Sequence, residues 1–351
     1  MGLPQRRGYG DDHETFRASV RRLLETEAEP QLGAWRDAGA IPRTLALSLG
    51  EQGFLGTSIP EDLGGGGADD PRFVAVLVEE AVAIGATGLA LVLANHCGVC
   101  TSAMLRLPDS DLRTQALAGA ADGSTLAAPM LLDGDRQSRG VPGAMTAGHF
   151  VVSRVDPDKK RTVSLYRRDV VEVLAGPSTL GGLESGIGDV RLTPAAFADT
   201  PTMSDDDDLV GRDFDLWSAV VSAAGARRAL ELALGYVGER SVFGRPLSDF
   251  ENTRFRLAEV AADLSVVECF VGVCLEQVAG GALSRANAAA VRMVAGGAYD
   301  RAVDQSLQFH GGYGYMREFP IAHAYGDARF VRQAAATMGD PRPVLASAIG
   351  L

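Results

Sequence analysis

Four long segments in the C-terminal part of this 351-residue chain place apolar residues at three- and four-residue intervals. They span residues 216–240, 252–279, 284–308 and 321–337. This spacing is typical of amphipathic helices, each of which must bury one stripe against another element. Four such helices predict a helical bundle, in a C-terminal domain that we place at residues 209–351.

Helical spacing also dominates the N-terminal part, which we expect to form a helical domain over residues 1–122. The clearest helical segments are residues 15–27, 42–52, 70–85 and 89–105. A run of four glycines, Gly64 to Gly67, interrupts them. Glycine loses the most conformational entropy on ordering, so this run is expected to be a loop.

The character of the sequence changes near Gly123. Short β-branched runs, typical of strands, occur at residues 150–152, 162–166, 170–174 and 189–192. They predict a small middle β domain at residues 123–208, and therefore an α+β chain overall. The acidic run Ser204 to Asp208 is expected to be a solvated connector, and its charge also favours the N-terminus of the helix that follows.

The overall charge limits the classes of partner. The chain carries 33 basic and 45 acidic residues, for a formal net charge of −12. An acidic surface repels phosphate backbones and anionic lipid, so we expect neither a nucleic-acid nor a membrane partner. A polyanionic ligand would require a local basic patch.

Two of the four cysteines, Cys97 and Cys100, follow His96 with the spacing of half a zinc site. No second pair with matching spacing exists, and the segment is apolar, so buried thiols and no metal site are predicted. The first residues contain no apolar run typical of a secretory signal, and no uninterrupted apolar run reaches membrane-spanning length. The chain is therefore expected to be cytoplasmic.

Two motifs suggest a ligand site. The first is Arg-Ser-Val-Phe-Gly-Arg-Pro-Leu-Ser-Asp-Phe-Glu-Asn-Thr (240–253), and the second is Gln-Phe-His-Gly-Gly-Tyr-Gly-Tyr-Met-Arg-Glu-Phe-Pro (308–320). A guanidinium such as that of Arg240 can donate two parallel N–H hydrogen bonds to the oxygens of a phosphate. Glycines such as Gly311 and Gly312 let the backbone approach a ligand, whose phosphates peptide N–H groups can then cradle.

Together these motifs resemble the flavin-binding elements of the acyl-CoA dehydrogenase family. Pro-Glu-x-x-Gly-Gly (60–65), after Gly-Phe-Leu-Gly (53–56), and Asp-Ala-Arg (327–329) are similar to further family segments. The resemblance covers essentially the whole chain. It implies an order of helical domain, β domain and helical bundle, and FAD as the cofactor.

The resemblance also assigns roles to residues. In the family the arginine at Arg240 meets the FAD pyrophosphate across a dimer interface, and the phenylalanine at Phe243 packs near adenine or ring. A glutamine that contacts the phosphates is replaced here by Glu251, whose charge would repel them. Glu251 could instead form a surface ion pair with Arg254 or Arg256.

In the second motif, the resemblance implies that Gln308, Gly311 and Gly312 touch the adenosine-diphosphate half of FAD from a neighbouring subunit. The motif also contains His310. No nucleophile or metal ligand is apparent near it in the sequence, so a packing or capping role is predicted for this side chain.

The family reaction uses a glutamate that removes the α-proton of an acyl thioester. The two family positions for this base hold Ala335 and Phe214 here. Asp213 and Asp215 flank the second position and are the candidates to substitute, although their side chains are one methylene shorter. The catalytic base is therefore unknown at this stage.

The family segment Thr-Glu-Pro…Gly-Ser-Asp, which binds the flavin ring, is also altered. Residues 127–135, Ala-Ala-Pro-Met-Leu-Leu-Asp-Gly-Asp, stand in its place. Neither of the two tryptophans, Trp35 and Trp217, lies in the family's aromatic strand. Ring contacts from this chain are therefore not expected to follow the family pattern.

The resemblance implies an oxidoreductase acting on an acyl-CoA or acyl-carrier thioester. Loss of the base with retention of the interface elements predicts a subunit that helps to bind FAD at a subunit interface. The assembly would be a homodimer or a heterotetramer with a sister chain. Three alternatives remain open: a self-sufficient dehydrogenase that uses Asp213, Asp215 or Glu184, a flavin monooxygenase of the same fold, and a flavin-free scaffold subunit.

Overall fold

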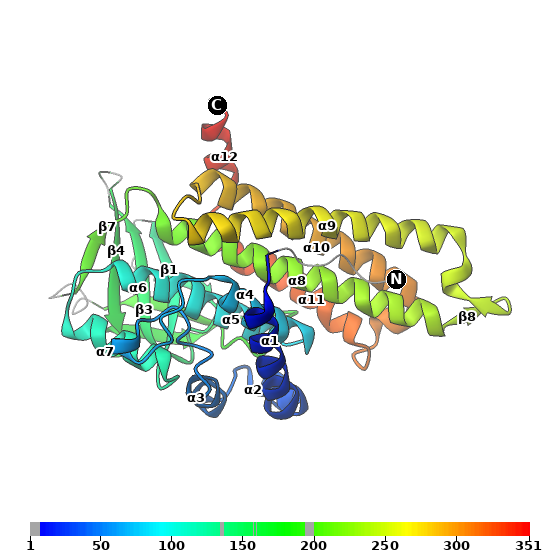
Figure 1. The fold of residues 1–351 in the computed structure, drawn as a ribbon, viewed down its shortest axis with the longest axis horizontal. Coiled ribbons are helices and arrows are strands. Elements are labelled where there is room, and N and C mark those ends of the chain that lie inside the picture. The colour runs from blue at the N-terminus through cyan, green and yellow to red at the C-terminus, as the bar shows by residue number, and fades with distance from the viewer. Residues whose placement is uncertain (1–7, 134–136, 157, 159, 194–199) are drawn as a thin grey trace.

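The computed structural model describes residues 8–133, 137–156, 158, 160–193 and 200–351. Figure 1 shows a group of strands at one end and long, nearly parallel helices that extend to the other end. Shorter N-terminal helices pack along one side. The elements change from helix to strand between Ala121 and Leu126, and back to helix between Ser204 and Leu209.

The N-terminal part is helical, as predicted. Its α-helices are α1 (Asp11–Leu23), α2 (Leu32–Ala38), α3 (Arg43–Glu51), α4 (Arg72–Ala83), α5 (Thr87–Leu93), α6 (Thr101–Arg106) and α7 (Asp111–Ala121). Short π and 3-10 turns supplement them at η1 (Leu24–Ala28), η2 (Glu29–Gln31), η3 (Glu61–Leu63) and η4 (Ala94–Cys100). The glycine run 64–67 forms a loop, as its composition predicts.

The segment α5–η4–α6 is one continuous helix from Thr87 to Arg106. By length and composition alone it could cross a bilayer, but 89% of its most apolar window is buried inside the protein, as in a core helix. Cys97 and Cys100 are buried within it as free thiols, as predicted. A Cβ at Gly98 would come within 2.3 Å of the Trp217 ring, so a glycine is needed for this helix to pack closely on α8 (Leu209–Glu239).

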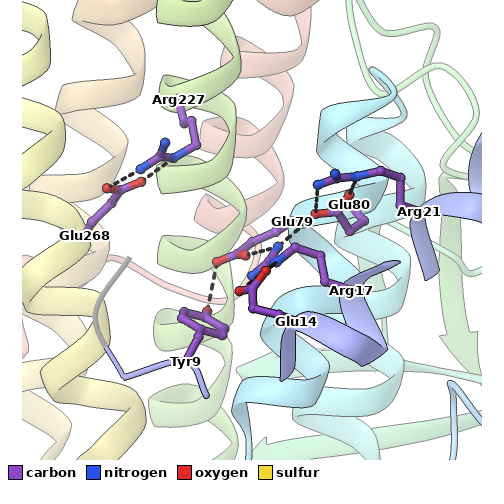
Figure 2. Close-up of polar contacts among 8 residues, drawn as sticks. All are labelled: Tyr9, Glu14, Arg17, Arg21, Glu79, Glu80, Arg227 and Glu268. Carbon is purple, nitrogen blue, oxygen red and sulfur yellow. Dashed lines mark hydrogen bonds and ion pairs between the residues drawn. The ribbon is translucent and has the colours of Figure 1, made fainter. Parts of the chain in front are cut away.

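Buried ion pairs tie α1 to α4 (Figure 2). Arg17 lies 2.8 Å from both Glu79 and Glu80, and Arg21 donates a second bond of 2.8 Å to Glu80. The Tyr9 hydroxyl donates to Glu79 at 2.9 Å. Carboxylates buried in this way need such partners, because an unpaired buried charge is strongly destabilising.

The β domain contains two sheets. The strands are β1 (Leu126–Asp133), β2 (Gln137–Val141), β3 (Ala147–Val155), β4 (Arg161–Arg167), β5 (Val171–Ala175), β6 (Gly188–Leu192) and β7 (Thr202–Ser204), with the turn η5 (Arg168–Val170) after β4. One sheet has the order β1-β3-β4-β7 and the other β2-β6-β5. The β1–β3 pair is parallel, whereas the other pairs in these sheets are antiparallel.

The four-stranded sheet is buried on both faces. Val151 of β3 packs into the main core shared with the helices, whereas its neighbours Phe150 and Val152 pack into a second core between the sheets. This alternation follows from the two-residue period of a strand. It explains why β3 has a continuous apolar run rather than an alternating pattern.

The bundle is formed by α8, α9 (Glu251–Ala279), α10 (Arg285–His310) and α11 (Pro320–Ala336), and a short α12 (Arg342–Ala348) follows. These four helices match the four predicted segments. The ion pair of Arg227 with Glu268 joins α8 to α9 (Figure 2).

The acidic run before α8 differs in part from the prediction of a solvated connector. Asp205 is buried, and its carboxylate accepts hydrogen bonds from the backbone N–H groups of Leu209 and Val210 at 2.7 and 3.4 Å. It therefore satisfies the free N–H groups at the start of α8, in the way that the N-terminal charge argument anticipates.

Candidate functional site

The two motifs that the sequence singles out line one cleft of a single chain, with a volume of about 740 Å³. The cleft lies where α8 ends, α9 begins and α10 passes into the 3-10 turn η8 (Gly311–Tyr315). Arg240, Gln308, Gly311 and Gly312 all contribute to its wall. The structure thus brings together four of the six residues predicted to bind the cofactor.

Arg240 stands at the C-terminal cap of α8, where the backbone becomes extended. Its N–H donates to the Tyr236 carbonyl at 2.9 Å, and its own carbonyl accepts from the Leu247 N–H at 2.7 Å. These bonds fix the backbone while the side chain is exposed. Within the described part of the chain, no ion pair or hydrogen bond engages the guanidinium, which is therefore available to an anion.

The cleft wall carries a positive charge. Arg256 is its second cation and lies 3.5 Å from Glu259, and none of the described residues that line the cleft is acidic. In a chain with a net charge of −12, this is the local basic patch that a polyanionic ligand requires.

The Gly311–Gly312 turn leaves open space in front of the backbone. Gly311 has a φ of +56°, which favours glycine, and a Cβ added at either position would meet no atom within 4 Å. Side chains at these positions would project into space that a ligand could occupy. The bare backbone therefore suits close approach of a bulky anionic group.

His310 closes the inner end of this turn. Its ring stacks on Tyr236, with centroids 4.1 Å apart, and its Nδ1 is 2.7 Å from the Ser306 carbonyl oxygen. Burial lowers its pKa, so the ring is neutral near pH 7. These contacts are those of a packing residue.

Phe243 and Glu251 do not line the cleft. Phe243 lies at the turn of a hairpin formed by β8 (Ser241–Val242) and β9 (Arg245–Pro246), has a φ of +52° and is 97% exposed. Glu251 is the first residue of α9, where its charge is favourable to the helix dipole. Asn252 and Thr253 line the cleft instead, and the described lining residues include no carboxylate.

Sequence reasoning missed Asn252, Thr253, Arg256 and Gln305 as lining residues. Asn252 and Arg256 are four residues apart and therefore share one face of α9. That spacing, next to the Arg240 motif, is the signal that could have revealed them.

One guanidinium contacts both Ala335 and Asp215, the residue next to Phe214. Arg292 of α10 donates to the Asp215 carboxylate at 2.6 Å and to the Ala335 carbonyl at 2.5 Å. Phe214, next to Asp215 on α8, is fully buried in the core. Arg292 thus links α8 to the end of α11, close to the two positions at which the resemblance predicted a base. Nothing in the sequence pattern marked Arg292.

The candidate substitutes for the base are engaged in ion pairs. Asp215 is buried and pairs with both Arg285 and Arg292. Asp213 is buried too, with Arg212 at 2.7 Å on one oxygen and Arg106 at 3.2 Å on the other. Each of these two carboxylates is therefore engaged by two guanidinium groups.

Glu184 is buried behind α5. Its Oε1 accepts from the Gly88 and Leu89 N–H groups at 2.7 and 3.4 Å, so it caps the long helix 87–106. Burial, together with the nearby carboxylate of Asp327, raises its pKa to about 7. Glu184 is not among the residues that line the cleft.

The segment that replaces the family's ring-binding sequence forms β1. Ala128 pairs with Phe150 of β3, and Met130 pairs with Val152. The side chains of these four residues are buried in the core between the sheets. Gly134 and Asp135, at the end of the predicted segment, lie outside the described residues.

Two protein-family models match this chain. Residues 10–124 match the acyl-CoA dehydrogenase N-terminal domain, and residues 216–336 match the acyl-CoA dehydrogenase C-terminal domain. The chain belongs to the acyl-CoA dehydrogenase family. This confirms the predicted resemblance and the α+β architecture of helical domain, β domain and helical bundle.

Individual relatives are distant in sequence but match nearly the whole of this chain. The long-chain specific acyl-CoA dehydrogenase of Rattus norvegicus mitochondria is 26% identical over 92% of this chain and 83% of the relative. An acyl-CoA dehydrogenase structure from Geobacillus kaustophilus has a TM-score of 0.86 at 23% identity, covering 99% and 100% of the two chains. A Bacillus anthracis acyl-CoA dehydrogenase complexed with FAD has a TM-score of 0.82 at 18% identity, covering 99% of this chain and 68% of the other.

Proposed function

We propose that this chain is a subunit of an acyl-CoA dehydrogenase assembly that lacks the catalytic glutamate and helps to bind FAD at a subunit interface. The observation that carries the proposal is the cleft shared by Arg240, Gln308 and the Gly311–Gly312 turn. Membership of a family that includes a structure with bound FAD supports the same cofactor here.

The cleft residues fit the adenosine-diphosphate half of the cofactor. The Arg240 guanidinium would pair with the pyrophosphate, and Arg256 would add charge. Amide groups of Gln308 and Asn252 would orient the polar groups beside it. Gly311 and Gly312 would admit the group closely because no side chain occupies the space. When bound, FAD would accept the hydride that is removed from the acyl thioester.

The length of α8 supports an assignment across subunits. Phe214 and Arg240 are 26 positions apart on this helix, which places them about 39 Å apart at 1.5 Å per residue. That span exceeds an extended FAD molecule. A cofactor held at Arg240 would therefore reach the base position of another subunit and not that of its own chain.

The residues around the predicted base positions suggest that another subunit removes the proton. Ala335 and Phe214 carry no carboxylate, and Asp213 and Asp215 are both engaged in ion pairs. We infer that the α-proton is removed by a sister chain that carries the glutamate. The substrate would be an acyl-CoA or acyl-carrier thioester, and the assembly would be cytoplasmic.

Exposed apolar side chains near the cleft suit a partner subunit. Phe243 is 97% exposed and Tyr315 is 86% exposed, and Phe255 of α9 is also exposed. Large aromatic groups left in water mark protein interfaces more often than free surfaces. A homodimer or a heterotetramer would cover them.

The proposal is tested by flavin content. Arg240→Ala should reduce the 450 nm flavin absorbance per chain at least tenfold, in protein purified alone or with its sister chain. Arg254→Ala is the matched control, because Arg254 is an exposed arginine of α9 outside the cleft wall. Native mass spectrometry would report subunits and cofactor together.

Unchanged flavin in Arg240→Ala would refute the cofactor site. Flavin that appears only on co-expression would support the shared interface. Bleaching of the lone chain by an acyl-CoA would instead identify a self-sufficient dehydrogenase.

A further inference from the structure

A second cleft, of about 420 Å³, lies between α3 and the start of the β domain. Its walls are the first turns of α3, the Gly123–Leu126 turn and the Met145–Gly148 loop, and Arg168 of η5 completes it. None of these residues lines the cofactor cleft. Its volume lies within the range of small-molecule sites in proteins.

The ionisable side chains that line this second cleft, among the described residues, are Arg43 and Arg168. No carboxylate faces them there. A wall that carries only positive charge is unusual in a chain with 45 acidic and 33 basic residues. It indicates an anionic ligand.

Arg43 is exposed and is the first residue of α3. No ion pair or hydrogen bond involving its side chain occurs within the described ranges, and the first turn of α3 contains no acidic residue. A positive charge at a helix N-terminus opposes the helix dipole. A bound anion would offset both the side-chain charge and the dipole.

Arg168 forms the opposite side. Its Nη1 donates to the Ala144 and Ala147 carbonyl oxygens at 2.7 and 3.1 Å, which anchors the Met145–Gly148 loop. Its Nε and Nη2 groups make no hydrogen bond to another described residue. The Arg168 guanidinium is thus held in place through Nη1, and the N–H groups of its Nε and Nη2 can donate to a ligand.

The remaining wall has hydroxyl and apolar parts. Ser124, Thr125 and Thr146 contribute hydroxyl groups, whereas Leu126 and Met145 contribute apolar surface. The backbone is closely packed around this space. A Cβ at Gly123 would lie 1.9 Å from the Ala46 carbonyl oxygen, and one at Gly148 would lie 2.3 Å from a Thr125 methyl carbon. Glycine is therefore needed at both positions for the backbone to pack in this way around the cleft.

We propose that this cleft binds a small organic phosphate, a phosphate monoester on an uncharged body. Two guanidinium groups and several hydroxyls match the oxygens of a phosphate monoester. The apolar wall and the volume accommodate a body larger than inorganic phosphate. This proposal does not depend on the assignment of the FAD cleft.

Equilibrium binding to the purified full-length chain tests it, by calorimetry with 4′-phosphopantetheine, adenosine 5′-monophosphate and inorganic phosphate as probes. At least one ester should bind more tightly than inorganic phosphate. Arg43→Gln should weaken that binding at least tenfold, and so should Ser124→Glu, which introduces a like charge. Arg139→Gln removes an exposed arginine outside the cleft and should leave binding unchanged.

Arg240→Ala separates this site from the cofactor cleft. Ester binding should survive that substitution, and flavin content should survive Arg43→Gln. The proposal is overturned if no ester binds, or if inorganic phosphate binds as tightly as the esters. Equal loss in Arg43→Gln and Arg139→Gln, or loss in Arg240→Ala, would also overturn it.

Discussion

Arg292 of α10 and Asp215 of α8 form a buried ion pair with a separation of 2.6 Å, and the same guanidinium reaches the Ala335 carbonyl. The Asp215 side chain is 1% exposed and that of Arg292 is 10% exposed. This pair links α8 to α10, and the bond to Ala335 extends the link to α11.

The link should be detectable in stability. Arg292→Met leaves one oxygen of the buried Asp215 without its partner and should lower the free energy of unfolding by about 2–3 kcal/mol. Adding Asp215→Leu removes the orphaned charge and should recover part of that loss. Urea unfolding at pH 7 of the two single variants and the double variant measures the coupling. If the changes in the free energy of unfolding of the two single variants simply add up in the double variant, Arg292 and Asp215 are not coupled.

Glu184 predicts how stability depends on pH. Its folded pKa is raised to about 7 from 4.5, so between these values the folded chain keeps a proton that the unfolded chain has lost. The free energy of unfolding should therefore fall as pH rises through this window, by about 3 kcal/mol in total from this group. Burial raises the pKa of Asp327 as well, which acts in the same direction.

Glu184→Gln keeps an oxygen for the Gly88 N–H but cannot ionise. The variant should be more stable than the natural chain at pH 8 and nearly equal to it at pH 4.5. Thermal unfolding across this range measures the difference. An identical pH profile for both proteins would show that Glu184 does not titrate in this way.

A substitution at Gly312 can distinguish an effect on ligand binding from an effect on folding. Gly312→Val places a side chain in open space, so the free energy of unfolding should change by less than about 0.5 kcal/mol. Flavin content should nevertheless fall several-fold, because the side chain would occupy the cofactor's place. Gly296→Val is a control for the added bulk, because a Cβ at Gly296, on α10, would also meet no atom within 4 Å. Retention of flavin by Gly312→Val would place the cofactor elsewhere.

Phe243 combines backbone strain with exposure. Phe243 and Gly244 both have positive φ in a two-residue hairpin turn, for which Asn-Gly is the favoured sequence. Phe243→Asn should therefore stabilise the isolated chain by about 1 kcal/mol while weakening its assembly. Chemical unfolding and analytical ultracentrifugation measure these two effects. A variant that assembles as tightly as the natural chain would remove Phe243 from the interface.

Periodicity predicted the bundle well because α9 and the second half of α8 each bury one stripe, although the first half of α8 is buried all round. The β domain was predicted less completely. The segment Ala127–Leu132 was interpreted only as an altered ring-binding motif, although it forms β1, whose two faces pack into different cores. A strand buried on both sides lacks the alternation that identifies a half-exposed strand.

For the candidate site, motif spacing found Arg240 and Gln308, but it could not reveal which neighbours share their cleft. Arg256 reaches it through the geometry of α9, and Arg292 meets Ala335 only after α10 and α11 pack together. Such contacts depend on tertiary structure and leave no local signal. The domain limits at residues 122 and 208 remain a prediction.

The length of α8 has an evolutionary consequence. Substitutions at positions about 40 Å apart on one helix contribute to stability almost independently. Sequence change around Phe214 could therefore proceed without affecting the end of the helix at Arg240. A gene duplicate could in this way lose turnover, yet remain indispensable to a sibling that cannot retain its coenzyme unaided.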